Sequence, residues 1–154
     1  MLAAGNRPLK RKTNFRPPEL LAETMEEIIN LLKKSGYSQK AIDYYTQKTN
    51  VGRIENPSAQ FSFTGPCGDT MEIYLRIEDG IIKNAKFQAI GCAGAMASGS
   101  ALTEMVKGKK IKEAKEIKVE DIISHLGGLP GPKGHCALLT KTTLVKALNE
   151  YQEE

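Results

Sequence analysis

The chain has 154 residues, of which 40% are hydrophobic, so it is long enough for one globular domain with a substantial core. Its formal charge of +4 is too small by itself to imply a nucleic-acid partner. No stretch approaches the roughly 20 apolar residues of a membrane span, so no membrane partner is expected. Three cysteines are an odd number, which argues against a secreted disulfide framework and predicts a cytoplasmic protein.

Much of the net positive charge comes from basic residues in residues 1–16, before the first acidic residue, Glu19. A basic terminus of this kind has three interpretations: a segment that binds nucleic acid, an organelle-targeting sequence, or a solvated, poorly ordered end. Pro8, Pro17 and Pro18 oppose an amphipathic targeting helix. We therefore predict that residues 1–16 are disordered and bind no nucleic acid.

Residues 17–34 have the pattern of a helix, which Gly36 ends. Its apolar residues recur at helical spacing: Leu21, Met25, Ile28 and Leu32. We assign residues 17–36 to an additional N-terminal helix that precedes the main domain, residues 37–154. In that domain, a short helix is predicted from Ser38 to Gln47, followed by an extended linker over residues 50–58.

Three strands are predicted next. Phe61 and Phe63 alternate with polar residues, and residues 71–78 alternate in the manner of a half-buried strand, with Tyr74 on the polar side. Asp79-Gly80 is a strong hairpin signal, after which a partner strand continues through Phe87 to Ala89.

The remainder is predicted to be helical. A helix from Gly94 is rich in small residues and can approach its neighbours closely, and two short helices follow over residues 111–117 and 119–126. We interpret His125 as a surface residue. After a Gly- and Pro-rich loop, a last helix begins near His135 and carries Leu138, Val145 and Leu148 on one side. The predicted fold class is α+β, a three-stranded antiparallel sheet covered on one face by helices.

The cysteines lie far apart in the sequence, but each occupies a loop or the end of an element. Cys67 follows the first strand, Cys92 follows the third, and Cys136 stands beside His135 where the last helix begins. Each is close to a glycine, and Asp69 lies two residues after Cys67. Helix starts favour negative charge, and glycine lets a backbone fold closely around a bound group.

Each of these residues alone has a simpler interpretation. A lone cysteine is usually a small hydrophobe, Asp69 suits a turn, and His135 suits a helix start. Together, the five favour a metal or iron–sulfur cluster site: Cys67, Asp69, Cys92, His135 and Cys136. Zinc in a structural or hydrolytic site remains an alternative with the same ligands, although the sequence lacks the H-E-x-x-H and H-x-E signatures of zinc enzymes.

Over Tyr37 to Tyr151 the chain resembles the IscU/NifU-type iron–sulfur cluster assembly scaffolds. The segments that carry the resemblance are Asn50-Val51-Gly52, Gly65-Pro66-Cys67-Gly68-Asp69, residues 85–100, residues 102–109 and Lys133-Gly134-His135-Cys136. The resemblance implies a scaffold and not an enzyme. On it a 2Fe–2S cluster forms from iron and sulfur, with a cysteine desulfurase as sulfur donor and a ferredoxin-like electron donor, and passes to apo-proteins.

The resemblance also implies roles for individual residues. Cys67, Cys92 and Cys136 match the thiolate ligands, and Cys136 matches the usual persulfide acceptor. Asp69 and His135 match further ligands, of which Asp69 is exchangeable. Lys133 matches a nearby basic residue that supports thiolate character. His135 argues against the related zinc-binding sulfur-transfer branch, which lacks a histidine at this position.

Two features depart from the family pattern. Many relatives carry Leu-Pro-Pro-Val-Lys, which a dedicated Hsp70-type chaperone grips, whereas here the segment is Leu129-Pro130-Gly131-Pro132-Lys133. The changed centre predicts weak or absent binding to such a chaperone. The N-terminal helix is additional, and its expected roles are self-association into a homo-oligomer, partner docking or packing.

Overall fold

The computed structural model describes residues 18–131 and 134–151, and the side chains from residue 24 onward. The chain divides into two compact units, residues 1–31 and 32–154. Helix α1, Pro18–Lys34, confirms the predicted N-terminal helix from Pro18 on and carries Lys33 and Lys34 in its last turn, where cations suit the helix dipole. Pro17 and the predicted disorder of residues 1–16 lie outside the described residues.

The second unit is built on one antiparallel sheet in the order β1-β2-β3. Strands β1 (Ala59–Thr64), β2 (Thr70–Glu78) and β3 (Ile81–Ile90) pair so that Phe61, Ile73 and Phe87 lie side by side across the sheet. The alternating apolar residues of β2 are buried, as predicted: Met71, Ile73, Leu75 and Ile77.

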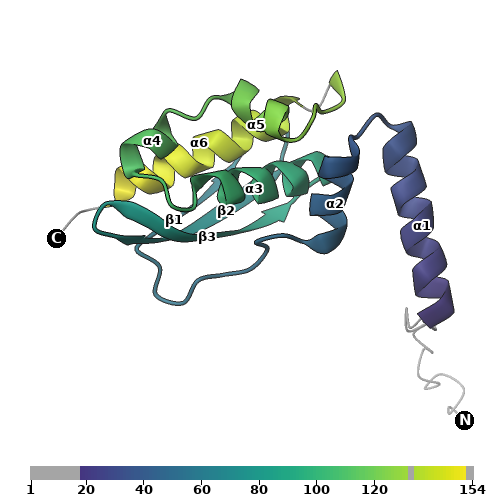
Figure 1. Ribbon diagram of the computed structural model, residues 1–154, viewed down its shortest axis with the longest axis horizontal. Helices are drawn as coiled ribbons and strands as arrows, with labels where there is room; N and C mark the ends of the chain where they lie inside the picture. Colours follow the sequence, from purple (N-terminus) through teal and green to yellow (C-terminus); the bar gives the residue numbers. More distant parts are fainter. Residues whose placement is uncertain (1–17, 132–133, 152–154) are drawn as a thin grey trace, which may run out of the picture. The chain divides into compact units, whose positions relative to one another are not determined.

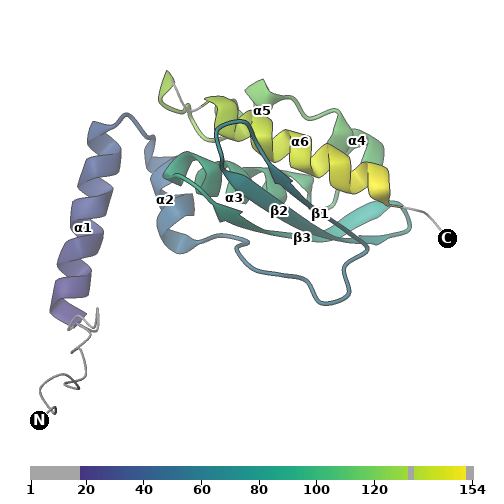
Figure 2. The same cartoon turned by 180° about the vertical axis from the view of Figure 1, so that it is seen from behind.

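Helices cover this apolar face (Figure 1). They are α3 (Ala93–Val106), α4 (Ile111–Lys115), α5 (Val119–His125) and α6 (Gly134–Glu150), while α2 (Gln39–Gln47) packs against α3. The view from behind shows α6 running over β1 and β2 (Figure 2). The predicted α+β class, with one sheet face covered by helices, is confirmed. Among the described residues, no helix is both long and apolar enough to cross a membrane.

The small residues of α3 allow it to lie directly on β3. Residues 97–103 of this helix are all buried. A Cβ built on Gly99 would lie 2.4 Å from the Phe87 ring, so only glycine fits at this contact. Phe87 itself is fully buried, and the Asn50–Gly52 segment fixes its backbone through bonds of 3.0 Å from Phe87 N–H to the Asn50 carbonyl and 2.8 Å from Gly52 N–H to the Phe87 carbonyl.

The segment over residues 50–58 is more than the extended linker that the sequence predicted. Val51 forms a parallel bridge with Phe87, and Arg76 donates hydrogen bonds to the carbonyls of Glu55 and Asn56, the latter at 2.6 Å. The segment thereby runs along the sheet face that the helices leave open (Figure 1). On the same face, Tyr74, placed on the polar side by alternation, is 3% exposed and donates a hydrogen bond to Glu72.

We expect Tyr74 to make the protein lose stability at alkaline pH. Burial, followed by the hydrogen bond and charge of Glu72, raises the pKa of Tyr74 from 10.0 to about 12. Between these values the unfolded chain loses the phenol proton while the folded chain keeps it, so stability falls as pH rises above 10, by at most about 1.4 kcal/mol per pH unit. Urea unfolding from pH 8 to 11 should show a shallower decline for Tyr74→Phe than for the wild type; equal slopes would contradict the assignment.

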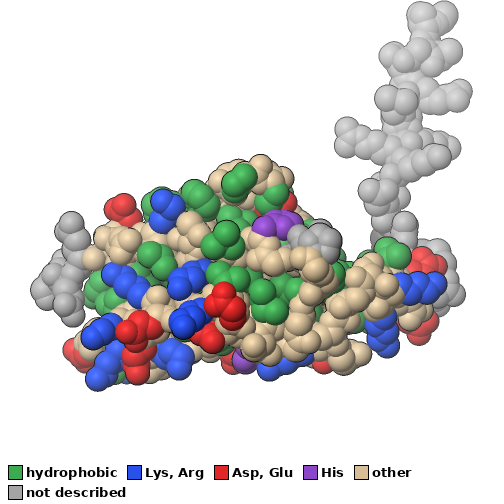
Figure 3. Space-filling model, turned by 90° about the horizontal axis from the view of Figure 1, so that it is seen from above, with side chains coloured by type: hydrophobic (Ala, Val, Ile, Leu, Met, Phe, Trp, Pro, Cys, Tyr) green, Lys and Arg blue, Asp and Glu red, His purple; other side chains and the backbone are tan. Residues whose placement is uncertain are grey.

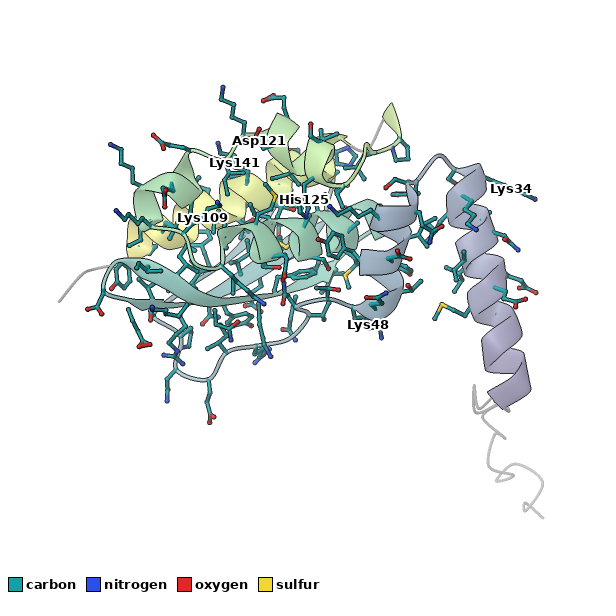
Figure 4. The ribbon with its side chains drawn as sticks, in the orientation of Figure 1. Lys34, Lys48, Lys109, Asp121, His125 and Lys141 are labelled. Atoms are coloured by element: carbon teal, nitrogen blue, oxygen red, sulfur yellow. The ribbon has the colours of Figure 1, made fainter. Side chains whose placement is uncertain are left out.

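The structure adds detail to two sequence interpretations. Of the residues that the pattern places on one side of the last helix, Leu138 is 55% exposed, whereas the buried side of α6 passes through Leu139, Leu144 and Leu148. His125, taken as a surface residue, lies on α5 and is half-buried (Figure 4). It lies 2.8 Å from the Tyr44 hydroxyl and stacks on that ring, and burial lowers its pKa from 6.5.

Candidate metal centre

The sheet pairing brings the three cysteines to one end of the domain. Thr70 starts β2 and pairs with Thr64 on one side and Ile90 on the other, so the β1–β2 turn lies beside the end of β3. Cys67 lies in that turn, and Cys92 is the N-cap of α3. Cys136 is in the first turn of α6, which packs against both β1 and α3.

The ligand atoms of the five predicted residues form two overlapping sets. Cys67, Asp69 and His135 form one set, and Asp69, Cys92 and Cys136 form the other, with the atoms of each set within 4.8 Å of one another. The Sγ atoms of Cys92 and Cys136 lie 3.4 Å apart, and Cys92 Sγ lies 3.8 Å from Asp69 Oδ2. Asp69 belongs to both sets. It therefore lies between the pair Cys67 and His135 and the pair Cys92 and Cys136.

These spacings suit tetrahedral coordination. Metal–sulfur bonds of about 2.3 Å place neighbouring ligands about 3.8 Å apart around one tetrahedral ion. The distance from Cys92 Sγ to Asp69 Oδ2 is 3.8 Å, close to that value, and the distance to Cys136 Sγ is somewhat shorter, at 3.4 Å. Sulfur, carboxylate and imidazole groups are also the donor types that iron and zinc accept in proteins.

Access differs across the site. Cys67 and His135 are exposed, Asp69 and Cys92 are half-buried, and Cys136 is 0% exposed. A partner therefore meets Cys67 and His135 first, whereas Cys136 forms the floor of the site.

Glycines hold Asp69 in position. Gly65 N–H donates a 2.9 Å bond to the Asp69 carbonyl, and Gly68 has a φ of +92°, a value that residues with a side chain rarely adopt. A Cβ built on Gly91 would lie 2.6 Å from the Asp69 carboxylate carbon. The carboxylate thus occupies the space above Gly91, which explains the glycine directly before Cys92.

Tyr37 is a residue of this site that the sequence did not reveal. It is 9% exposed, and burial, followed by charge on Cys92 and on Cys136, raises its pKa from 10.0 to about 12, although a backbone hydrogen bond with Gly94 opposes the shift. Its phenol therefore remains protonated beside the two inner cysteines. It stands alone before an N-cap, Ser38, and no periodic pattern marks it. Lys133, predicted to support the thiolates, lies outside the described residues.

The fold and the site together define a small α+β protein that presents sulfur, carboxylate and imidazole ligands at one end of an antiparallel sheet. Residues 36–154 match the model of the NifU-like N-terminal domain family. The chain belongs to this family.

Named relatives cover most of the chain. The iron–sulfur cluster assembly scaffold protein IscU 1 of Archaeoglobus fulgidus is 42% identical over 116 residues, which are 75% of this chain and 76% of the relative. The IscU scaffold protein of Escherichia coli K12 is 39% identical over 123 residues, which are 77% of this chain and 95% of the relative.

Solved structures agree with the fold. A crystal structure assigned as a SUF-system iron–sulfur scaffold from Fervidobacterium islandicum has a TM-score of 0.62 at 28% identity, over 73% of this chain and 96% of that one. A NifU-like N-terminal structure from Brucella abortus has a TM-score of 0.61, over 77% of this chain and 95% of that one; at 17% identity it supports the fold alone.

Proposed function

We propose that this protein is a scaffold, not an enzyme, on which a 2Fe–2S cluster is assembled and then passed to apo-proteins. The observation that carries the proposal is the pair of ligand sets that share Asp69. A 2Fe–2S cluster takes four ligands from the protein, two for each iron. Five candidate ligands allow one to be exchanged while four hold the cluster. The names of the relatives support the same function.

A single zinc ion at the same residues is less well supported. A structural zinc site is closed and has four ligands, whereas Cys67 and His135 are exposed here. A zinc ion at one ligand set would also leave the second set without a role.

Anaerobic incubation with ferrous iron, sulfide and reductant tests the function. A scaffold should become brown, with visible absorption and equal amounts of iron and sulfide in the purified protein. Uptake of zinc alone, with no cluster under any of these conditions, would overturn the proposal. Zinc in a freshly purified sample would not, because the same donor atoms bind it adventitiously.

In the proposed sulfur step, the thiolate of Cys136 attacks the terminal sulfur of a cysteine desulfurase persulfide, and the desulfurase thiolate leaves. Two electrons from a ferredoxin-like donor then release sulfide and restore the Cys136 thiolate. Because Cys136 is buried, this step requires the first turn of α6 to open. Lys133 would support the thiolate, and Cys67, already exposed, is the alternative acceptor.

We expect Asp69→Ala to permit cluster assembly but to slow transfer to an apo-acceptor severalfold. A hard carboxylate oxygen is the weakest ligand that the site offers to an iron–sulfur cluster, so an incoming thiolate should displace it first. Transfer rates from cluster-loaded wild type, Asp69→Asn and Asp69→Ala measure the effect. If both variants hand over clusters at the wild-type rate, Asp69 is not the exchange point.

Gly91→Ala provides a matched variant that leaves Asp69 itself intact. Its added Cβ would displace the Asp69 carboxylate, and transfer should slow as in Asp69→Ala. If Asp69 only shapes the turn, Asp69→Asn should behave like the wild type, and Asp69→Ala should lower the melting temperature without changing transfer.

Several further parts of the proposal are supported by sequence alone. The protein would work in the cytoplasm, with a desulfurase, an electron donor and apo iron–sulfur proteins as partners. Weak or absent binding to a dedicated Hsp70-type chaperone is proposed from Gly131, and a homo-oligomer from the additional N-terminal helix.

A further inference from the structure

The end of the sheet opposite the cysteines carries a surface rich in lysine. Residues 107–118 contain six lysines and two glutamates, so this segment alone has a net charge of +4, equal to that of the whole chain. It joins α3 to α5 and contains α4. Lys and Arg side chains gather on this side, with some acidic groups among them (Figure 3), and Lys109 lies where the segment meets the β2–β3 hairpin (Figure 4). We call residues 107–118 with the hairpin turn 79–81 the lysine surface.

Among the described residues, one of these six lysines forms a salt bridge with a carboxylate. Glu113 accepts a 2.9 Å hydrogen bond from the backbone N–H of Lys110, and Asp121 accepts one of 2.8 Å from the backbone N–H of Lys118. Within the described part of the chain, the one salt bridge joins Lys107 to Glu104 at 3.5 Å. The ammonium groups of the other five lysines therefore have no carboxylate partner among the described residues.

The lysine surface also contains a hollow of about 500 Å³. Ile81 and Ile111 line it together with Lys110, Lys112, Lys115 and the hairpin turn Asp79-Gly80. The two isoleucines are half-buried, and the lysines that line the hollow are exposed. The hollow thus combines apolar side chains with a cationic rim.

Backbone hydrogen bonds hold this hollow in shape. Ile82 N–H donates to the Lys109 carbonyl at 2.9 Å, Ile111 N–H donates to the Gly80 carbonyl at 3.1 Å, and Gly108 N–H donates to the Ile82 carbonyl at 2.7 Å. A bound segment would therefore meet a surface that is already ordered. Because this surface loses little conformational entropy on binding, the affinity is not reduced by an ordering cost.

We propose that the lysine surface docks an acidic segment of a partner protein, with one apolar side chain of that segment in the hollow and its carboxylates against the lysine rim. Charge complementarity selects an acidic partner. The two isoleucines favour a polypeptide over nucleic acid or lipid headgroups, because a phosphate group has no apolar side chain to place in the hollow.

Docking at this surface would leave the cysteines accessible. Strand β2 has nine residues and runs from the cysteine end to the hairpin, a distance of about 30 Å. A partner bound at the lysine surface would leave uncovered the end of the sheet that carries the cysteines. This inference does not depend on which metal or cluster the cysteines bind.

A fluorescein-labelled synthetic peptide, Asp-Glu-Asp-Glu-Leu-Phe-Asp-Glu-Asp-Glu, tests the proposal by fluorescence anisotropy with the full chain. Binding should weaken as salt rises, because exposed charges are screened. The double variant Lys112→Gln/Lys115→Gln should weaken it about three- to tenfold, from two exposed charge pairs. A peptide with Leu-Phe replaced by Ser-Ser should bind more weakly than the parent.

The matched control is Lys33→Gln/Lys34→Gln, which removes the same charge from two exposed lysines of α1 and should leave binding unchanged. Circular dichroism and melting temperature establish that both variants fold. No binding at low salt, or equal losses in the two double variants, would overturn the proposal. So would tighter binding of a single-stranded RNA or of phosphatidylserine vesicles than of the peptide.

Discussion

Replacing Cys136 by serine is expected to reduce persulfide formation on this protein to background when a desulfurase and cysteine are supplied. A serine hydroxyl is a far weaker nucleophile than a thiolate, and in the proposal Cys67 and Cys92, the latter 3.4 Å from Cys136, are ligands and not acceptors. Mass spectrometry of the protein, with the modified cysteine located by proteolysis, measures the outcome.

Burial makes a second variant necessary. Cys136 is 0% exposed, and serine alters both the packing there and the contact with Cys92 Sγ, so partial unfolding would also reduce the persulfide. Cys136→Ala removes the thiol without burying a polar atom and should give the same loss with a native circular dichroism spectrum.

The exposed thiol supplies the opposite test. Cys67→Ser should leave most of the persulfide in place, since Cys67 is a ligand in the proposal and not the acceptor. An undiminished persulfide on both Cys136 variants, together with its loss in Cys67→Ser, would assign sulfur acceptance to the accessible residue.

The convergence of the ligands was predictable because it follows from chain connectivity. In an antiparallel sheet, the turn after the first strand and the end of the third strand lie at the same end of the sheet, and the start of a helix can lie beside them. Cys67, Cys92 and Cys136 occupy those positions. The sequence thus indicated which end of the domain carries the site, although the sharing of Asp69 between two ligand sets required coordinates.

Other features escaped prediction because long-range packing decides them. Tyr74 sits on the polar side of an alternating strand, yet it is 3% exposed on a face that residues 50–58 also cross (Figure 1). His125 is half-buried through a contact with Tyr44, 81 positions away in sequence. Periodicity describes one element at a time and contains no information about such partners.

Gly99→Ala is expected to destabilise the protein by about 2 kcal/mol or more, because overpacking a filled core costs about 1–3 kcal/mol and sometimes more. Alanine is intrinsically better than glycine in a helix by up to about 1 kcal/mol, so the two effects oppose each other. The packing effect should win here, since the new Cβ would lie 2.4, 2.5 and 2.8 Å from three atoms of the Phe87 ring.

The matched control is Gly134→Ala, at the first residue of α6, where a Cβ would meet nothing within 4 Å. Its melting temperature should stay near that of the wild type, while Gly99→Ala should melt roughly 5–10 °C lower. The double variant Gly99→Ala/Phe87→Leu should be more stable than the sum of its single changes, because the smaller side chain relieves the clash.

The same substitution connects packing to the metal centre. Cys92 is the N-cap of α3, and Gly99 lies seven residues along that helix, so a shift of α3 away from β3 also moves Cys92 relative to Asp69 and Cys136. Gly99→Ala should therefore lower the yield of reconstituted cluster at temperatures where the protein is still folded. Gly134→Ala is the control for stability and should leave the melting temperature unchanged. A Gly99→Ala protein with wild-type stability and cluster yield would show that α3 can move without consequence, and would refute this account of how the fold positions the site.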